Sequence, residues 1–231
     1  MKRFYQNVDV APADGGWRVV LDGRGIKTVA GRAQIVPTRA LAEALAAEWA
    51  VQDGEIDPTL YLYRDMADYA LDVVAPDQPQ AVQDLLPYAE TDTLCYRADP
   101  QDALFERQWA VWEPLLVAAE RRYDVHFERI SGIIHRPQPQ ATLARLATVM
   151  GSMDAFQLAA LRNMASLAAS LVLGLAALDP QAEVEAIWDA ANLEEDWQAE
   201  LWGKEEEAQA KRTRRLGIFA AAARFGTMAR G

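Results

Sequence analysis

Cysteine and histidine are nearly absent from this chain. Its 231 residues contain one cysteine, Cys95, and two histidines, His126 and His135. A single cysteine excludes an intramolecular disulfide and fits a reducing compartment. Three such residues cannot supply the four ligands of a usual structural zinc site, and no loop spacing supports a carboxylate-only metal site. We therefore expect no metal and no cofactor. Cys95 is interpreted as a small buried hydrophobe, with a cysteine–histidine nucleophile as the alternative.

Basic residues and long apolar runs are also scarce. Lysine and arginine number 23 against 34 aspartate and glutamate, which gives a formal net charge of -11. Such a field repels phosphate backbones, and only the short basic run at residues 211–215 could offset it, so we expect no nucleic-acid partner. The longest apolar run, residues 164–178, is shorter than the roughly 20 residues of a membrane helix. It predicts one buried core helix with a capping box at Asp154 and Gln157, ended by Pro180.

Two hydrophobic patterns divide the chain. Up to about Val36 the apolar residues alternate with polar ones between glycine-containing turns, which predicts short antiparallel strands in hairpins. Thr38 can cap a following helix, and an extended or mixed segment is expected after Pro58. From about Leu71 onward the periodicity is helical. The expected fold class is α+β, with short strands at the start of the chain and helices in the rest, in one large domain or two smaller ones.

One helix of the second half has a long apolar stripe. Spacings of three and four residues predict that a single buried face contains Phe105, Trp109, Trp112, Leu116, Ala119 and Tyr123. Pro114 should kink this helix. Residues 136–139 form a stiff Pro-rich connector to another helix. Both tryptophans of the stripe are therefore expected in the core.

The most unusual segment is residues 193–208, where carboxylates crowd beside Trp197 and Trp202. Crowded charges with interleaved aromatics favour a protein-binding surface over a catalytic pocket. A solvated helix face is the alternative. The run at residues 205–207 is three consecutive glutamates, which splay around a helix instead of converging as an acid and base pair would. The sequence offers no positive sign of an enzyme.

An ordered series of short motifs runs through nearly the whole chain. The first half contains Phe4-Tyr5 and Val8, Gly16-Trp17, Leu21-Asp22-Gly23-Arg24, Ile26-Lys27-Thr28, Val36-Pro37-Thr38, Leu41-Ala42 and Glu48-Trp49. The second half contains Leu94-Cys95-Tyr96-Arg97, Glu106-Arg107-Gln108, Trp112 with Pro114-Leu115-Leu116, Gly132-Ile133 with Gln138-Pro139, and Trp197-Gln198-Ala199-Glu200 with Trp202-Gly203. In this order and spacing the chain resembles the ATP synthase assembly chaperones that act on the alpha subunit, the ATP-twelve family of mitochondria and alphaproteobacteria. The lack of a transit peptide favours the bacterial branch and a cytoplasmic location.

The resemblance implies a fold of two domains: a small, mainly β N-terminal domain with one helix at residues 1–72, and a larger all-α C-terminal domain at residues 73–231. It also implies a function and a set of residues. The protein is expected to bind the unassembled alpha subunit transiently, to shield its apolar interface, and to release it to beta subunits, with no catalysis and no membrane insertion. The implied partner contacts are Glu206, with Glu205 and Glu207 as neighbouring candidates, Trp202 and Gly203. The implied structural residues are Trp49, which anchors a helix to the β domain, Trp109 and Trp112 in the core, and Arg97 and Arg107 in buried ion pairs.

Two departures and two alternatives remain. Val29 stands where the family commonly has proline, and the segment at residues 63–72 differs from the usual threonine-rich version, which puts functional residues carried into that segment in doubt. The alternatives are an enzyme that binds a small molecule or nucleotide, and a structural subunit of a larger complex.

Overall fold

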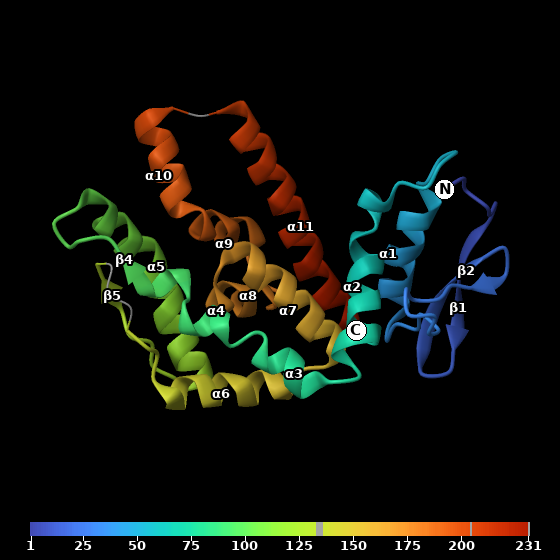
Figure 1. Ribbon diagram of the computed structural model, residues 1–231, viewed down its shortest axis with the longest axis horizontal. Helices are drawn as coiled ribbons and strands as arrows, with labels where there is room; N and C mark the ends of the chain where they lie inside the picture. Colours follow the sequence, from blue (N-terminus) through green and yellow to red (C-terminus); the bar gives the residue numbers. More distant parts are fainter. Residues whose placement is uncertain (133–135, 204, 231) are drawn as a thin grey trace. The chain divides into compact units, whose positions relative to one another are not determined.

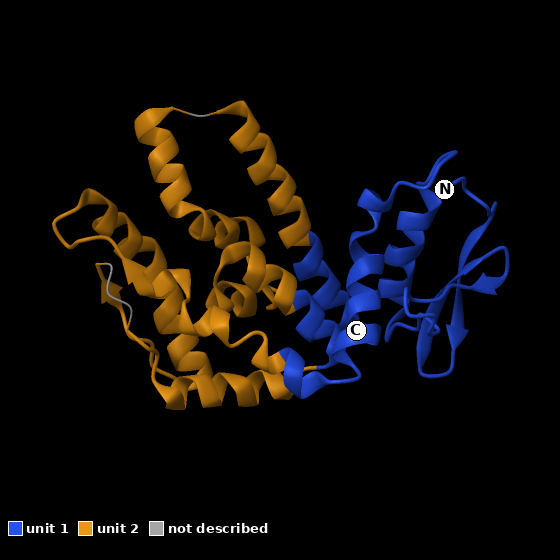
Figure 2. Ribbon diagram, in the orientation of Figure 1, with its two compact units in different colours: residues 1–81, 154–160, 221–231 blue, residues 82–153, 161–220 orange. Residues whose placement is uncertain are grey.

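The chain forms two compact units, which Figure 2 distinguishes by colour. The computed structural model describes residues 1–132, 136–203 and 205–230. Unit 1 consists of residues 1–81, 154–160 and 221–231, and unit 2 consists of residues 82–153 and 161–220. A small antiparallel sheet precedes a mainly helical chain, so the α+β fold class is confirmed. The domain limits expected from the sequence, residues 1–72 and 73–231, stay a prediction.

The sheet of unit 1 contains β1 (Val8–Ala13), β2 (Gly16–Leu21) and β3 (Arg24–Gly25), in that order and antiparallel. Asp22 and Gly23 connect β2 to β3, with φ values of 47° and 80°. Positive φ at both positions of a two-residue turn is the conformation that matches the twist of a hairpin, and an Asp-Gly pair adopts it readily. The predicted hairpins are confirmed.

Helix α1 (Arg39–Ala50) begins where the sequence predicts. The Thr38 hydroxyl accepts a hydrogen bond from the Leu41 amide at 3.1 Å and donates one to the Met228 carbonyl at 2.6 Å. The first bond satisfies one of the free amides of the first turn. Leu41 and Leu45 are buried on the inner face of the helix.

The next segment is more helical than expected. A 3₁₀ turn, η1 (Pro58–Leu60), is followed by α2 (Leu62–Tyr69), which continues as the π-helical η2 (Ala70–Val74). The Glu48 carboxylate of α1 accepts hydrogen bonds from the amides of Tyr63 at 2.6 Å and Arg64 at 2.9 Å. The prediction of an extended or mixed segment is therefore wrong for residues 62–70. The acceptor that caps α2 lies 15 residues away in sequence, where no local pattern reveals it.

Figure 1 labels all of the remaining elements except η3. They are α3 (Gln78–Gln83), α4 (Pro87–Glu90), η3 (Thr93–Cys95), β4 (Tyr96–Arg97), α5 (Ala103–Tyr123), β5 (Ile130–Ser131), α6 (Gln140–Gly151), α7 (Ala155–Ala168), α8 (Leu171–Ala177), α9 (Val184–Ala191), α10 (Leu193–Trp202) and α11 (Glu206–Arg230). Strands β4 and β5 pair in parallel. Among the described residues, no helix has both the length and the apolar character needed to cross a membrane.

Helix α5 buries a stripe that differs from the predicted one. Trp112 and Leu116 are fully buried as expected, but Trp109 is 52% exposed, so its predicted place in the core is wrong. The buried position one turn before Trp112 belongs to Gln108 instead. The Gln108 side chain accepts a hydrogen bond from the Ala98 amide at 2.7 Å and donates one to Glu194 at 2.6 Å, which offsets the desolvation of its amide.

The long apolar run forms two helices, and the prediction of a single core helix is wrong. Ala169 has φ +49° and ends α7. The Ser170 hydroxyl then caps α8 by accepting a hydrogen bond from the Leu173 amide at 3.0 Å. The chain can break here because the Asp92 carboxylate accepts the Val172 amide at 2.9 Å. A buried helix start needs such acceptors, and Asp92 comes from a distant part of the sequence.

The capping box predicted at the start of this run is confirmed. The Asp154 carboxylate accepts a hydrogen bond from the Gln157 amide at 2.9 Å, and the Gln157 side chain accepts one from the Asp154 amide at 3.1 Å.

Candidate functional site

Helix α10 is fixed to its neighbours by ion pairs and polar contacts, and Leu193 is its single buried residue. Arg107 of α5 donates two hydrogen bonds to Glu200, at 2.5 and 2.8 Å, and its guanidinium lies 5.4 Å from the centre of the Trp197 ring. The side chains of Arg107 and Glu200 are 36% and 51% exposed. The ion pair predicted for Arg107 therefore exists, but its predicted burial is wrong because both helices present these residues at the surface.

A second set of ion pairs connects α10 to α9 and α11. Arg212 of α11 donates to Asp189 at 2.7 Å and to Asp196 at 2.8 Å. Burial works against the charged form of Arg212, yet the two carboxylates raise its pKa. Ion pairs with little apolar burial beside them hold a helix weakly, since exposed ion pairs each contribute about 0–1 kcal/mol.

The end of α10 and the start of α11 expose the predicted partner-binding residues. We call residues 201–203 and 205–207 the acidic tip. Leu201 is 59% and Trp202 is 87% exposed, and Gly203 ends α10 with φ +98°. Glu206 and Glu207 lie in the first turn of α11, directly after the exposed Glu205. In the described part of the chain, the side chains of these three glutamates form no ion pair.

The start of α11 favours negative charge. The free amides of a first helical turn carry the positive end of the helix dipole, which stabilises a nearby carboxylate by about 0.3–1 kcal/mol. Glu206 and Glu207 can therefore stabilise the helix and still keep their oxygens free for a partner. The acidic tip combines a large exposed indole with carboxylates that have no ion-pair partner among the described residues. A protein ligand with an arginine beside an apolar patch would match this combination.

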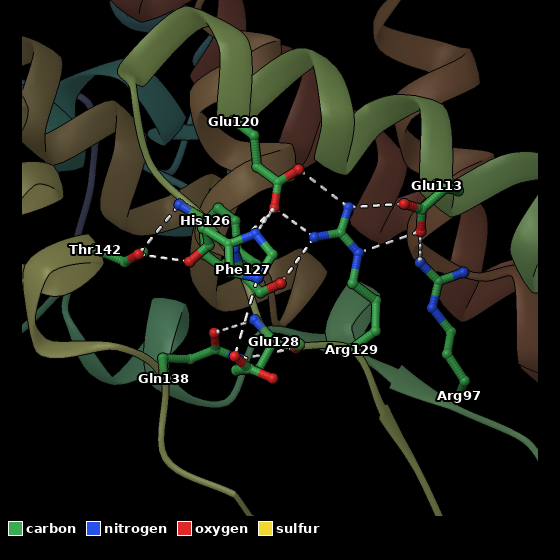
Figure 3. A network of polar contacts seen from close by, with 9 residues as sticks. All are labelled: Arg97, Glu113, Glu120, His126, Phe127, Glu128, Arg129, Gln138 and Thr142. Atoms are coloured by element: carbon green, nitrogen blue, oxygen red, sulfur yellow. Dashed lines mark hydrogen bonds and ion pairs between the residues drawn. The ribbon is translucent and has the colours of Figure 1, made fainter.

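A polar network in unit 2, shown in Figure 3, has a structural role. Arg129 donates to Glu113 at 2.7 Å and also to Glu120, and Arg97 donates to Glu113 at 3.2 Å. The Arg97 side chain is 1% exposed, so the buried ion pair predicted for it is confirmed. Burial alone would raise the pKa of Glu120, but hydrogen bonds from Arg129 and from the Phe127 amide outweigh it and lower this pKa. Every charge of the network is paired, which fixes the segment before β5 against α5.

Replacing Arg129 by methionine should lower the free energy of unfolding by about 2–4 kcal/mol, because Glu113 and Glu120 would lose a partner in a poorly hydrated place. Since the pKa of Glu120 is lowered in the folded protein, this contribution is present above its ordinary value of 4.5 and is lost as the pH falls below it. Denaturant unfolding at pH 7 and pH 4 measures both effects. The exposed Arg107→Met variant is the matched control, with an expected loss of at most about 1 kcal/mol. Equal losses would contradict the assignment.

Trp112, Trp49 and Cys95 have defined surroundings in the structure. Trp112 is buried and donates from its indole nitrogen to the Ala190 carbonyl at 2.8 Å. Trp49 packs against Tyr5 and Tyr61, with ring centres at 5.6 and 4.8 Å, which connects α1 to the N-terminal segment. Cys95 is buried, and burial raises the pKa of its thiol, which makes a reactive thiolate unfavourable.

Within the described residues, the charged contacts of the His126 side chain are with Glu120 and Glu128 and not with Cys95. The His126 side chain is 69% exposed and lies 3.2 Å from Glu120. His135 and Ile133 lie outside the described residues. Within residues 1–132, 136–203 and 205–230, no three histidine, cysteine or acidic side chains are grouped so that they could hold a metal ion.

The structural roles of two of the buried acids, Glu48 and Asp92, were not predicted. Glu48 caps α2; the sequence places this acid on the apolar face of a predicted helix, after Leu41 and Leu45, which indicates that it is buried but does not indicate that it caps α2. Asp92 is fully buried and accepts hydrogen bonds from Leu94 and Val172. Its role had no comparable signal because one of these donors is 80 residues away.

Comparison with known proteins decides the family. Residues 2–120, more than half of the chain, match the family described as ATP12 chaperone protein. The chain belongs to the ATP12 chaperone family. It is 26% identical over 223 residues to the mitochondrial protein atp12 of Schizosaccharomyces pombe, covering 90% of this chain and 75% of that one.

Two solved structures support this assignment. One is Atp12 from Paracoccus denitrificans, with TM-score 0.91, 34% identity, and coverage of 99% of this chain and 98% of that one. The other is a point mutant of the P. denitrificans protein, with the same identity and TM-score and 97% of its chain covered. The resemblance drawn from the motifs is confirmed, and the protein is an ATP12-family chaperone of ATP synthase assembly.

Proposed function

We propose that this protein binds the unassembled alpha subunit of ATP synthase through the acidic tip and releases it when beta subunits arrive. The observation that carries the proposal is Trp202, which is 87% exposed beside glutamates that have no ion-pair partner in the described chain. A large indole on a free surface is unfavourable unless a partner covers it. Family membership supports a chaperone role in ATP synthase assembly.

The physical basis is interface protection. An unassembled subunit exposes apolar surface that it later buries against its neighbours, and such a surface promotes aggregation. A chaperone that covers part of it keeps the subunit available for assembly. A larger and better-matched interface with beta can displace the chaperone by competition alone, so no nucleotide hydrolysis is required and we propose no catalytic activity.

Within the tip we assign Glu206 as the main polar contact, with Glu205 and Glu207 as its neighbours. A carboxylate pairs with an arginine through two parallel hydrogen bonds, and burial of such a pair at an interface makes loss of one partner costly. Trp202 supplies the apolar anchor, and Gly203 allows the turn between the two helices with its positive φ. We place the encounter with the client in the cytoplasm.

A co-expression pull-down tests the proposal. The protein serves as bait against separately expressed alpha and beta subunits of its own ATP synthase, and the soluble fraction of alpha is scored. We expect capture of alpha, no capture of beta alone, and loss of alpha from the bait when beta is added. Failure to capture alpha would overturn the proposal. Presence of the protein at unit stoichiometry in the finished enzyme would instead support a structural subunit.

A further inference from the structure

Unit 1 contains a cavity of about 500 Å³ that uses none of the residues of the acidic tip. It lies between the N-terminal segment, the β2–β3 turn and helices α1 and α2. This volume is within the roughly 300–1,000 Å³ of typical ligand sites. The lining residues that matter below are Phe4, Tyr5, Arg24, Lys27, Trp49 and Arg64.

Aromatic side chains form one part of the lining. The rings of Tyr5 and Trp49 meet edge to face, and the Tyr5 hydroxyl donates to the Trp49 carbonyl at 2.7 Å, which fixes both. Phe4 packs edge to face on Tyr5 and is 64% exposed. The cavity therefore offers a rigid apolar surface together with an aromatic ring that is still largely open to water.

Cations form the other part. Arg24 and Lys27 have no ion pair within the described residues, whereas Arg64 is held by Asp65 at 3.2 Å and Asp68 at 3.6 Å. The excess of positive charge is unusual in a chain with a net charge of -11. Free cations next to a low-dielectric wall attract anions.

The single carboxylate in the lining, Asp22, is already committed. It accepts hydrogen bonds from the amides of Gln6 at 3.1 Å and Asn7 at 2.8 Å, and these bonds lower its pKa. Asp22 thereby attaches the N-terminal segment to the β2–β3 turn. Its oxygens serve to build the wall, which leaves Arg24 and Lys27 for a ligand.

We propose that this cavity binds an acidic peptide segment, with a carboxylate paired to Arg24 or Lys27 and an adjacent apolar side chain against Phe4 and Trp49. The lining combines an aromatic surface with positive charge, so a matching ligand has both an apolar group and an anionic group. A small inorganic anion would leave the aromatic surface unused, and a purely apolar segment would desolvate two cations without pairing them. The site is independent of which subunit the chaperone holds, because it involves unit 1 alone.

Fluorescence anisotropy of a labelled peptide with the core Glu-Glu-Leu-Phe-Glu tests the proposal on the full-length protein. The double variant Arg24→Glu and Lys27→Glu should raise Kd at least about tenfold, and Phe4→Ala should raise it severalfold. Arg224→Glu is the matched control, because Arg224 is an exposed arginine of unit 1 outside the lining, and its effect should be below about twofold. Circular dichroism melts check folding, with Arg24→Gln as a milder substitute if the double variant unfolds.

Three results would overturn the proposal. They are unchanged binding to the charge-reversed cavity, equal affinity for a peptide with Gly-Ser in place of Leu-Phe, and full displacement of the peptide by an equal concentration of inorganic phosphate. The last would make the cavity a simple anion site. Because no subunit of ATP synthase is present, peptide binding together with a failed alpha pull-down would overturn only the proposed function.

Discussion

Replacing Asp92 by asparagine should lower the free energy of unfolding by about 2 kcal/mol at pH 7.5, with the fold retained. Asp92 is fully buried, and each of its carboxylate oxygens accepts a hydrogen bond from a backbone amide, one from Leu94 at 3.1 Å and the other from Val172 at 2.9 Å. Asparagine keeps one acceptor and turns an N–H group toward the other amide, which leaves a buried donor unsatisfied. The start of α8 should therefore become the weakest point of unit 2.

The loss should grow as the pH falls. Burial raises the pKa of Asp92 from 3.8 to about 6, although its hydrogen bonds partly oppose this. A raised carboxyl pKa means that the folded state holds the proton more tightly, so the contribution is complete below about pH 3.8 and is lost as the pH rises through about 6. Between pH 7.5 and pH 5, the free energy of unfolding of wild type should rise relative to that of the asparagine variant by on the order of 1 kcal/mol.

Urea unfolding of both proteins at pH 7.5 and pH 5 measures the two effects. Asp99→Asn is the matched control, since Asp99 accepts the Gln101 amide at 2.9 Å in the same local geometry but at the surface. It should change the free energy of unfolding by less than about 0.5 kcal/mol at either pH. A difference between wild type and Asp92→Asn that stays constant with pH would show that Asp92 does not titrate in this window.

Reversing the charge at Glu206 should abolish capture of the alpha subunit while leaving the fold intact. If Glu206 pairs with a client arginine that the complex desolvates, its loss weakens binding by about 2–5 kcal/mol, at least about thirtyfold in Kd. Glu206→Lys removes a favourable charge from the first turn of α11, which costs at most about 1 kcal/mol of stability. The pull-down and a thermal melt on the same variant separate the two effects.

Glu185→Lys provides the control for this variant. Glu185 is also an exposed acid in the first turn of a helix, α9, so the change in net charge and in helix dipole is the same. This variant should capture alpha as well as wild type does. Equal loss of capture in both variants would mean that net charge, not the acidic tip, governs binding. A large drop in the melting temperature of Glu206→Lys would make Glu206 a structural residue.

Local patterns predicted those parts of the fold whose partners lie within a few residues. The β2–β3 turn follows from Asp22-Gly23, and the capping box follows from Asp154 and Gln157. The cap of α1 follows from Thr38. The predictions that were wrong concern residues whose partners lie far away in the sequence. Burial of Trp109 was mispredicted because a distant glutamate, Glu194, satisfies the neighbouring glutamine and allows it into the core.

The candidate site shows the same division. Its acids, tryptophan and glycine adjoin one another in sequence, so their grouping could be predicted, and the motif order was sufficient to indicate the ATP12 family. Their exposure could not be predicted. It depends on Arg107 and Arg212, which hold α10 by ion pairs and leave its C-terminal end exposed.

The sequence by itself determined the α+β class, the hairpins, the helix caps at Thr38 and Asp154, and the family, because each depends on short-range hydrogen bonding or on an ordered pattern of residues. Only the tertiary structure decided where the apolar run breaks, which charges are buried, and that unit 1 has an open cavity lined by two cations without an ion pair among the described residues. Those features depend on groups from distant segments. Asp92 accepts a hydrogen bond from an amide at the start of α8, Glu48 does the same at the start of α2, and Trp49 packs against Tyr5. Burial is a property of the packed chain, and a local pattern cannot specify which distant group will be there to satisfy it.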